Sequence, residues 1–188
     1  MDSKDTIQKY ISLYMKRWIL GWTFVATLCA VPILVLGIKH HRFPFELFLP
    51  YAVEGLLLLF HKFLSRRFPK SIRIQEEMHA ISFSDHGAKQ IPTRLTGVDE
   101  DLYLSDDWII LAGSYALYKD HITRATCDVM ESKVYYYSMN FWTRSDQIYT
   151  LGMENRRGLK EVEQWLEANG IDLQRYDEKG NPTEKYHF

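Results

Sequence analysis

The stretch WILGWTFVATLCAVPILVLGI, residues 18–38, decides the fold of this 188-residue chain. It contains no charged side chain, and about 20 apolar residues are enough to cross a hydrocarbon core of about 30 Å. Trp18 and Trp22 stand at its start, where amphipathic rings favour the headgroup zone. A core helix of this length would show a polar face, and the KHHR sequence that follows offers no small-residue cleavage site for a signal peptide. We therefore predict a transmembrane helix.

A second apolar stretch, FPFELFLPYAVEGLLLLFHKFL, occupies residues 43–64. Polar side chains near its ends can reach the membrane interface, but Glu54 falls near the middle, where an ionised side chain costs roughly 2.5–3.5 kcal/mol. Only residues 39–42 separate the two stretches, so a short connection must join antiparallel helices. We predict a two-helix transmembrane hairpin within residues 18–70.

Glu54 and Thr27 are predicted to lie at the same depth, because each is twelve residues from the loop between the spans. The Thr27 hydroxyl is then a candidate hydrogen-bond partner for a protonated Glu54. One interpretation is a neutral carboxyl that joins helices within the hairpin or between protomers. The alternative is a proton or ion site in a small transport or pore-associated subunit. Two helices alone cannot enclose a conduction path, which favours the first interpretation.

The net charge of −1 conceals a split along the chain. Residues 1–70 carry ten Lys and Arg against four Asp and Glu, a net of +6, whereas residues 71–188 carry thirteen against twenty, a net of −7. The flanks of the hairpin hold nine Lys and Arg and its loop holds two, which predicts a multi-pass protein of the cell membrane with both termini in the cytoplasm. Five basic residues would hold the segment after the second span near anionic lipid at about 1 kcal/mol each, although the positive-inside rule alone also explains them: Lys62, Arg66, Arg67, Lys70 and Arg73.

The N-terminal segment, residues 1–17, has an amphipathic pattern. Apolar side chains recur at helical spacing, with polar ones between them: Ile7, Tyr10, Ile11 and Tyr14, followed by Trp18. The pattern fits a short helix on the membrane surface or a cytosolic extension of the first span.

Residues 71–170 are predicted to form a cytosolic α+β domain. Residues 72–81 are ambiguous, since Ile74, Met78 and Ile81 allow a short helix. Short runs of β-branched and aromatic residues, separated by turn residues, then indicate a small antiparallel sheet or barrel: residues 101–104, 108–112, 115–119, 122–129, 134–142 and 147–152.

One helix closes this domain. Asn155 is its predicted N-cap and Gly170 its predicted stop. Its buried stripe is predicted to be Leu159, Val162, Trp165 and Leu166. Residues 171–188 carry many charges and little periodicity, so we expect a flexible tail.

Meandering strands followed by one C-terminal helix follow the order of a pleckstrin-homology-like (PH-like) domain. Two stretches, LYLSDDWII at residues 102–110 and ALYKDHI at residues 116–122, carry a more particular resemblance. The chain resembles bacterial membrane proteins with two transmembrane helices and a PH-like cytosolic domain, the YcxB-like group and its relatives, over roughly residues 15–170. The resemblance implies membrane localisation and supplies no catalytic residue.

Motifs that carry chemistry are missing from the sequence. There is no Gly-rich phosphate loop, CxxC, HExxH or GxSxG pattern, so we expect no catalytic residue, no metal and no cofactor. A Cys127–His121 nucleophile is the strongest enzymatic alternative, but Cys127 falls on the apolar side of its strand. His40 and His41 in the loop could bind a metal, although such pairs are usually solvated. The near-zero net charge argues against a nucleic-acid partner.

The partners expected from the sequence are the lipid bilayer and a protein. A net charge of −7 after residue 70 opposes capture of anionic headgroups by the domain, which favours a protein partner or a second copy of the chain. Aromatic residues at 135–142 exceed what one face of a small sheet can bury, unless both faces are covered. The predicted function is a membrane-anchored, non-enzymatic interaction module, with these candidates for its interaction surface: Tyr135, Tyr137, Phe141 and Trp142.

Overall fold

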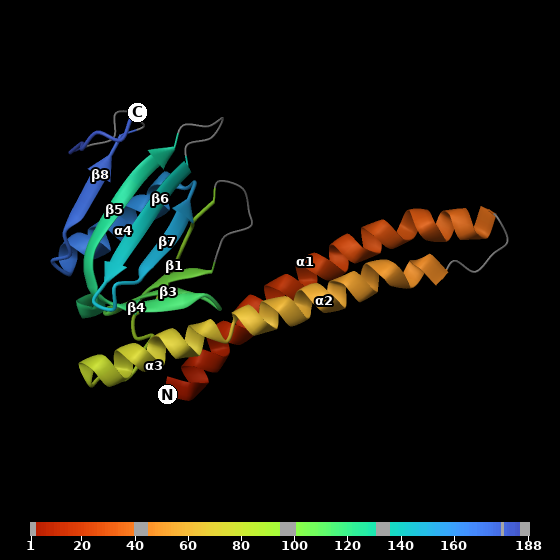
Figure 1. Cartoon of the computed structure of the whole chain (residues 1–188), viewed down its shortest axis with the longest axis horizontal. Coiled ribbons are helices and arrows are strands. Elements are labelled where there is room, and N and C mark those ends of the chain that lie inside the picture. Colours follow the sequence, from red (N-terminus) through yellow and green to blue (C-terminus); the bar gives the residue numbers. More distant parts are fainter. Residues whose placement is uncertain (1–2, 40–44, 95–100, 131–135, 178, 185–188) are drawn as a thin grey trace.

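Two long helical segments run side by side and project from a β-rich domain (Figure 1). The structure, a computed structural model, describes residues 3–39, 45–94, 101–130, 136–177 and 179–184. Helix α1 (Ser3–Lys39) forms the first segment. A short 3-10 turn (Phe45–Leu47) leads into α2 (Phe48–Leu64), and α3 (Arg67–His79) continues α2 after a break of two residues.

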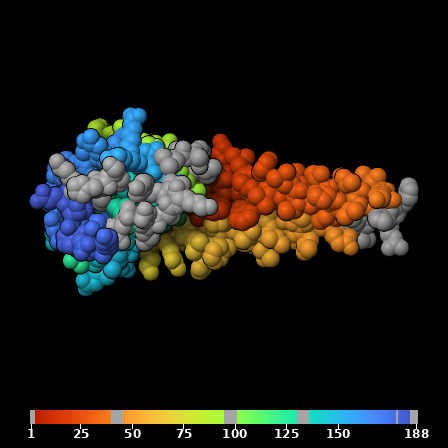
Figure 2. Space-filling model, turned by 90° about the horizontal axis from the view of Figure 1, so that it is seen from above, coloured from red at the N-terminus to blue at the C-terminus, as the bar shows by residue number. Residues whose placement is uncertain are grey.

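Both helical segments are long and apolar enough to cross a membrane. Leu20, Phe24 and Leu56 expose 64%, 66% and 68% of their surface, which a core helix of a soluble protein would bury. In the space-filling view the hairpin is a slim rod attached to a wider domain (Figure 2). These features support an association with the membrane through the hairpin.

The N-terminal segment is part of α1 and not a separate surface helix. Residues 3–17 and the predicted span form one continuous helix. Of the two alternatives, the structure therefore agrees with an extension of the first span. Tyr10 lies in this part and is completely buried.

The described residues form two four-stranded sheets, with orders β1-β2-β3-β4 and β7-β6-β5-β8. All pairs are antiparallel except the parallel pair of β5 with β8. The sheets do not join into a closed barrel. The strands are β1 (Lys89–Ile91), β2 (Leu102–Leu104), β3 (Trp108–Leu111), β4 (Tyr115–Tyr118), β5 (Ile122–Met130), β6 (Tyr136–Thr143), β7 (Ile148–Met153) and β8 (Leu173–Tyr176).

The inner faces of both sheets meet the C-terminal helix α4 (Arg156–Ala168) in the first core. The Asn155 side chain accepts from the backbone N–H groups of Arg157 and Gly158 at 3.0 and 3.2 Å, which confirms the predicted N-cap. Leu159, Val162 and Leu166 supply the buried stripe of α4, whereas Trp165, also predicted for this stripe, is only partly buried against the first core. The antiparallel sheets with a C-terminal helix are thus as predicted.

A second core, which we call the helix-side core, joins the outer face of the β1-β2-β3-β4 sheet to α1 and α3. Its buried members are Tyr10, Phe68, Ile72, Phe83, Trp108, Ile110, Ala112 and Ala116. Because the alternate residues of β3 point to opposite sides, Ile109 enters the first core while Trp108 and Ile110 enter this one. The β1-β2-β3-β4 sheet is therefore covered on both faces.

Polar contacts fix the two helices to the domain. Gln75 of α3, which is 1% exposed, donates to the Ala116 carbonyl at 2.7 Å and accepts from the Tyr118 N–H at 2.7 Å. The side-chain amide thus satisfies backbone groups at the edge of β4 that would otherwise lack a strand partner.

On α1, Lys9 and the Tyr10 hydroxyl both contact Asp85, at 2.6 and 3.3 Å. Burial raises the pKa of Asp85, but the hydrogen bonds and the positive charge of Lys9 outweigh burial and hold that pKa below its usual value. Asp85 is therefore an anion that ties α1 to the segment before β1.

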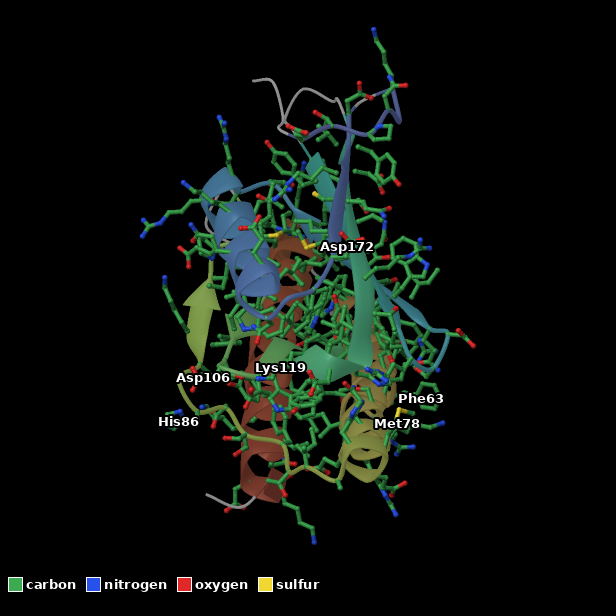
Figure 3. The ribbon with its side chains drawn as sticks, turned by 90° about the vertical axis from the view of Figure 1, so that its left-hand side faces the viewer. Phe63, Met78, His86, Asp106, Lys119 and Asp172 are labelled. Atoms are coloured by element: carbon green, nitrogen blue, oxygen red, sulfur yellow. The ribbon has the colours of Figure 1, made fainter. Side chains whose placement is uncertain are left out.

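Two sequence predictions are corrected here. The predicted flexible tail, residues 171–188, contains β8, because Ile171 and Leu173 pack on the first core and Leu173 pairs with Ala125. The predicted boundary at residue 71 falls inside α3. Its buried side is formed by Phe68 and Ile72, while Ile74 and Met78 are exposed. Figure 3 shows Met78 on the outer side of α3, beyond the domain core.

Candidate functional site on the outer face of the β7-β6-β5-β8 sheet

The outer face of the β7-β6-β5-β8 sheet is the face that no described helix covers. Helix α4 packs on the opposite side of these strands, as the end-on view shows (Figure 3). On β6, Tyr137, Met139 and Phe141 enter the first core, so the even-numbered residues point to the outer face. This alternation decides which aromatic side chains are available to a partner.

The centre of the outer face is a polar ladder across three strands. Asn140 of β6 donates to Asp128 of β5 at 3.1 Å and accepts from the Thr150 hydroxyl of β7 at 2.8 Å. Asn140 and Thr150 are also register partners. Because the Asn140 side chain both donates and accepts, its orientation is fixed, and the ladder presents a defined pattern of polar groups.

Aromatic and apolar side chains lie at the two ends of the ladder. At one end, the Arg124 guanidinium lies 4.4 Å from the centroid of the Trp142 ring, and Ile148, the register partner of Trp142, is 56% exposed. At the other end, Tyr136 is 38% exposed and lies against Gly152, where a side chain would collide with its ring. Trp, Tyr and Arg are the residue types most enriched in interface hot spots.

The four residues of the predicted interaction surface do not share one face. Trp142 lies on the outer face. Tyr137 and Phe141 are wrong, because they are 2% and 0% exposed and belong to the first core. Tyr135 lies outside the described residues. The alternation of side chains along β6 would have separated these residues. The polar residues Ser138 and Asn140 indicate that the even-numbered positions point outward.

The Cys127–His121 pair of the enzymatic alternative is not formed. His121 is the last residue of the short turn Lys119–His121, which comes directly before β5. Cys127 lies five residues further along β5 than Ile122, so the strand rise separates these two backbone positions by about 16 Å. Cys127 is completely buried in the first core.

His121 has a structural setting. Its Nδ1 lies 3.3 Å from His79 Nε2, and its Nε2 lies 3.3 Å from the Ser145 hydroxyl. Burial, followed by the charges of His79 and Arg144, lowers the pKa of His121 to about 4. The His121 ring is therefore neutral near pH 7. It connects the end of α3 with the turn before β5 and the turn after β6.

The described residues contain no group of three or more His, Cys, Asp or Glu that could hold a metal ion. The histidine pair that could bind a metal on sequence grounds, His40 and His41, lies outside them.

Glu54 has a partner in the hairpin, but not the predicted one. The Thr23 hydroxyl donates to Glu54 Oε1 at 2.6 Å, whereas the Thr27 hydroxyl donates to the Thr23 carbonyl of its own helix at 2.8 Å. The prediction that Thr27 is the partner of Glu54 is thus wrong, because the partner, Thr23, lies one helical turn earlier in α1. A hydrogen bond between α1 and α2 is what the helix-joining interpretation of Glu54 requires.

The five basic residues at the end of the second span and after it are all exposed, on α2, α3 or between them. Because α3 continues α2, the helical rise places Arg73 about 14 Å beyond Leu64, past a Debye length of about 8–10 Å. Arg73 also pairs with Glu77 at 2.9 Å. The structure thus places Lys62, Arg66, Arg67 and Lys70 nearer to the predicted membrane surface than Arg73.

Comparison of the chain with models of protein families and with curated proteins found no match. Its function is therefore inferred from geometry and chemistry.

Proposed function

We propose that this chain is a membrane-anchored interaction module that works without catalysis. The observation that carries the proposal is the difference between the two sheets. The β1-β2-β3-β4 sheet is covered on both faces, whereas the β7-β6-β5-β8 sheet has no described helix on its outer face. A face that combines Arg124, Trp142 and Tyr136 with an ordered polar ladder has the composition of a protein-binding surface.

The domain is further proposed to be PH-like. A four-stranded meander, a three-stranded meander and a C-terminal helix follow one another in the chain, with β8 added at the edge of the second sheet. That order supports the proposal, as does the resemblance to the YcxB-like group.

The proposed topology has both termini in the cytoplasm. The first part of α1 and the buried side of α3 belong to the helix-side core, which supports placing the N-terminus and the domain on the same side of the membrane. The excess of Lys and Arg on that side favours the cytoplasm.

The proposed partner is a protein, which includes a second copy of the chain. The ladder residues are neutral apart from Asp128, and Arg124 is the one basic side chain on the described outer face of β5 and β6. A single guanidinium does not match the repeated phosphates of a nucleic acid. The stacked Arg124 and Trp142 side chains at one end of the face and the Tyr136 ring at the other favour a protein partner with complementary apolar contacts.

The test is site-specific photo-crosslinking of the full-length protein in its native membrane. A photoreactive residue replaces Ile148 on the outer face or, as a control, Lys160 on α4, which is also exposed. A cross-linked band at Ile148 that is missing at Lys160 and is lost in Trp142→Ala is the expected result. A band near twice 22.3 kDa identifies a second copy, and any other defined mass identifies a different protein. Equal cross-linking at both positions, or none at either, overturns the proposal.

A further inference from the structure

A cavity of about 370 Å³ lies where the first membrane span meets the domain. One wall is a single face of α1, formed by Tyr14, Arg17, Trp18 and Gly21, which follow helical spacing. The facing wall includes Leu111 and Ser114 from the end of β3 and the turn before β4. The cavity is thus built jointly by the hairpin and the domain.

Three of the described residues that line the cavity carry charged side chains. Arg17 and Arg94 bring two guanidinium groups and Asp101 brings one carboxylate. Arg17 Nη1 lies 3.8 Å from Asp101 Oδ2, longer than the 2.7–2.9 Å or so of a charge-assisted hydrogen bond. Among the described acidic turn residues of the domain, Asp101 lines the cavity, whereas Asp106 and Asp107 do not.

The other part of the cavity is apolar and lies beside the start of the predicted first span. Trp18 is the first residue of the predicted span and Gly21 lies almost one turn inside it. No atom lies within 4 Å of a Cβ built on Gly21, so the helix surface there is open. The cavity therefore passes from charged groups to apolar groups across the expected membrane boundary.

We propose that this cavity binds one anionic phospholipid, with its phosphate near Arg17 and Arg94 and the start of an acyl chain beside Gly21. Guanidinium groups match phosphate oxygens in geometry and charge. A free phosphate ester would use only the charged part, whereas a phospholipid fills both parts. The inference rests on the membrane position of the hairpin and is independent of the protein partner proposed above.

The test uses full-length protein in nanodiscs that contain phosphatidylglycerol and phosphatidylcholine in equal amounts. After transfer to a mild detergent, native mass spectrometry counts the lipids that stay bound. We expect one phosphatidylglycerol per chain and little phosphatidylcholine. At about 1 kcal/mol per basic residue, Arg17→Gln and Arg94→Gln should each weaken retention about fivefold, and Asp101→Asn should strengthen it about fivefold.

Two matched controls separate a specific site from general effects. Arg66→Gln removes an exposed charge at the same boundary but outside the cavity, and it should leave retention unchanged. Gly21→Leu fills the apolar part, whereas Gly55→Leu adds the same side chain to an equally open position on α2 that does not line the cavity. Only Gly21→Leu should release the lipid. Since both positions are open, neither substitution should unfold the protein.

Three outcomes overturn the proposal. The first is retention that does not discriminate between the two lipids. The second is an equal loss in Arg66→Gln and Arg17→Gln, which would mean general surface attraction. The third is displacement of the lipid by millimolar glycerol 3-phosphate, which would identify a site for a soluble phosphate ester. None of these outcomes depends on whether a protein cross-links at Ile148, so the two proposals can fail separately.

Discussion

Replacing Tyr10 with alanine should open the domain although Tyr10 precedes the first membrane span. Its ring is completely buried, with its centroid 6.2, 6.3 and 5.1 Å from those of Phe68, Phe83 and Tyr103. Truncation of a buried aromatic side chain to alanine costs about 3–5 kcal/mol. Tyr10→Phe keeps the ring and loses only the hydrogen bond to Asp85, worth about 1 kcal/mol.

Cys127 provides the assay. The chain has two cysteines, so Cys29→Ser leaves Cys127, which is completely buried in the first core, as the single thiol. Its alkylation in detergent-solubilised full-length protein reports opening of the domain, and a loss of 3–5 kcal/mol raises the rate by roughly two to three and a half orders of magnitude. Leu13→Ala, at a half-exposed position of the same helix, should change the rate only slightly. An unchanged rate in Tyr10→Ala would refute the idea that the helix-side core and the first core open together.

Three further substitutions test other parts of the structure. Gln75→Leu leaves the Tyr118 N–H and the Ala116 carbonyl unpaired, so it should cost about 2–6 kcal/mol of unfolding free energy in urea titrations, and a cost below 1 kcal/mol would contradict the edge contact. Glu54→Gln keeps an oxygen that accepts from Thr23 and should leave the hairpin and its stability unchanged, whereas a loss of proton or ion flux in vesicles on this substitution would support the transport alternative. His121 has a folded-state pKa of about 4 against a usual 6.5, so the unfolded chain binds the proton more readily. Stability should therefore fall as the pH drops from about 6.5 to about 4, and the His121→Gln profile should be flatter in that window.

Elements with a strong local signal could be predicted from the sequence. The uncharged run at residues 18–38 and the runs of β-branched and aromatic residues between turn residues each depend on a local pattern that neighbouring residues determine. Helix α4 is the clearest case, because its cap at Asn155 and its left-handed Gly170 (φ +68°) both lie within a few residues of its ends.

Contacts between distant segments could not be predicted as well. Counting from the loop gave the depth of Thr27 to within one turn, but the stagger of α1 against α2 selects Thr23. In the same way, β8 is stabilised by its pairing with β5, almost 50 residues earlier, and its own four residues carry little signal. Tyr137 is buried and Trp142 lies on the outer face, because the pairing of β6 with its neighbours buries the odd-numbered side chains. Composition alone does not reveal this difference.

Amide hydrogen exchange of the full-length protein in nanodiscs tests the central claim most directly. The claim is that the hairpin helices continue into the helix-side core and mount the domain as one unit, with the outer face of the β7-β6-β5-β8 sheet left for a partner. If so, a peptide covering residues 4–16 should exchange as slowly as one covering residues 108–111 of β3. Fast exchange of residues 4–16 while β3 stays protected would show that α1 frays independently, and it would contradict the account.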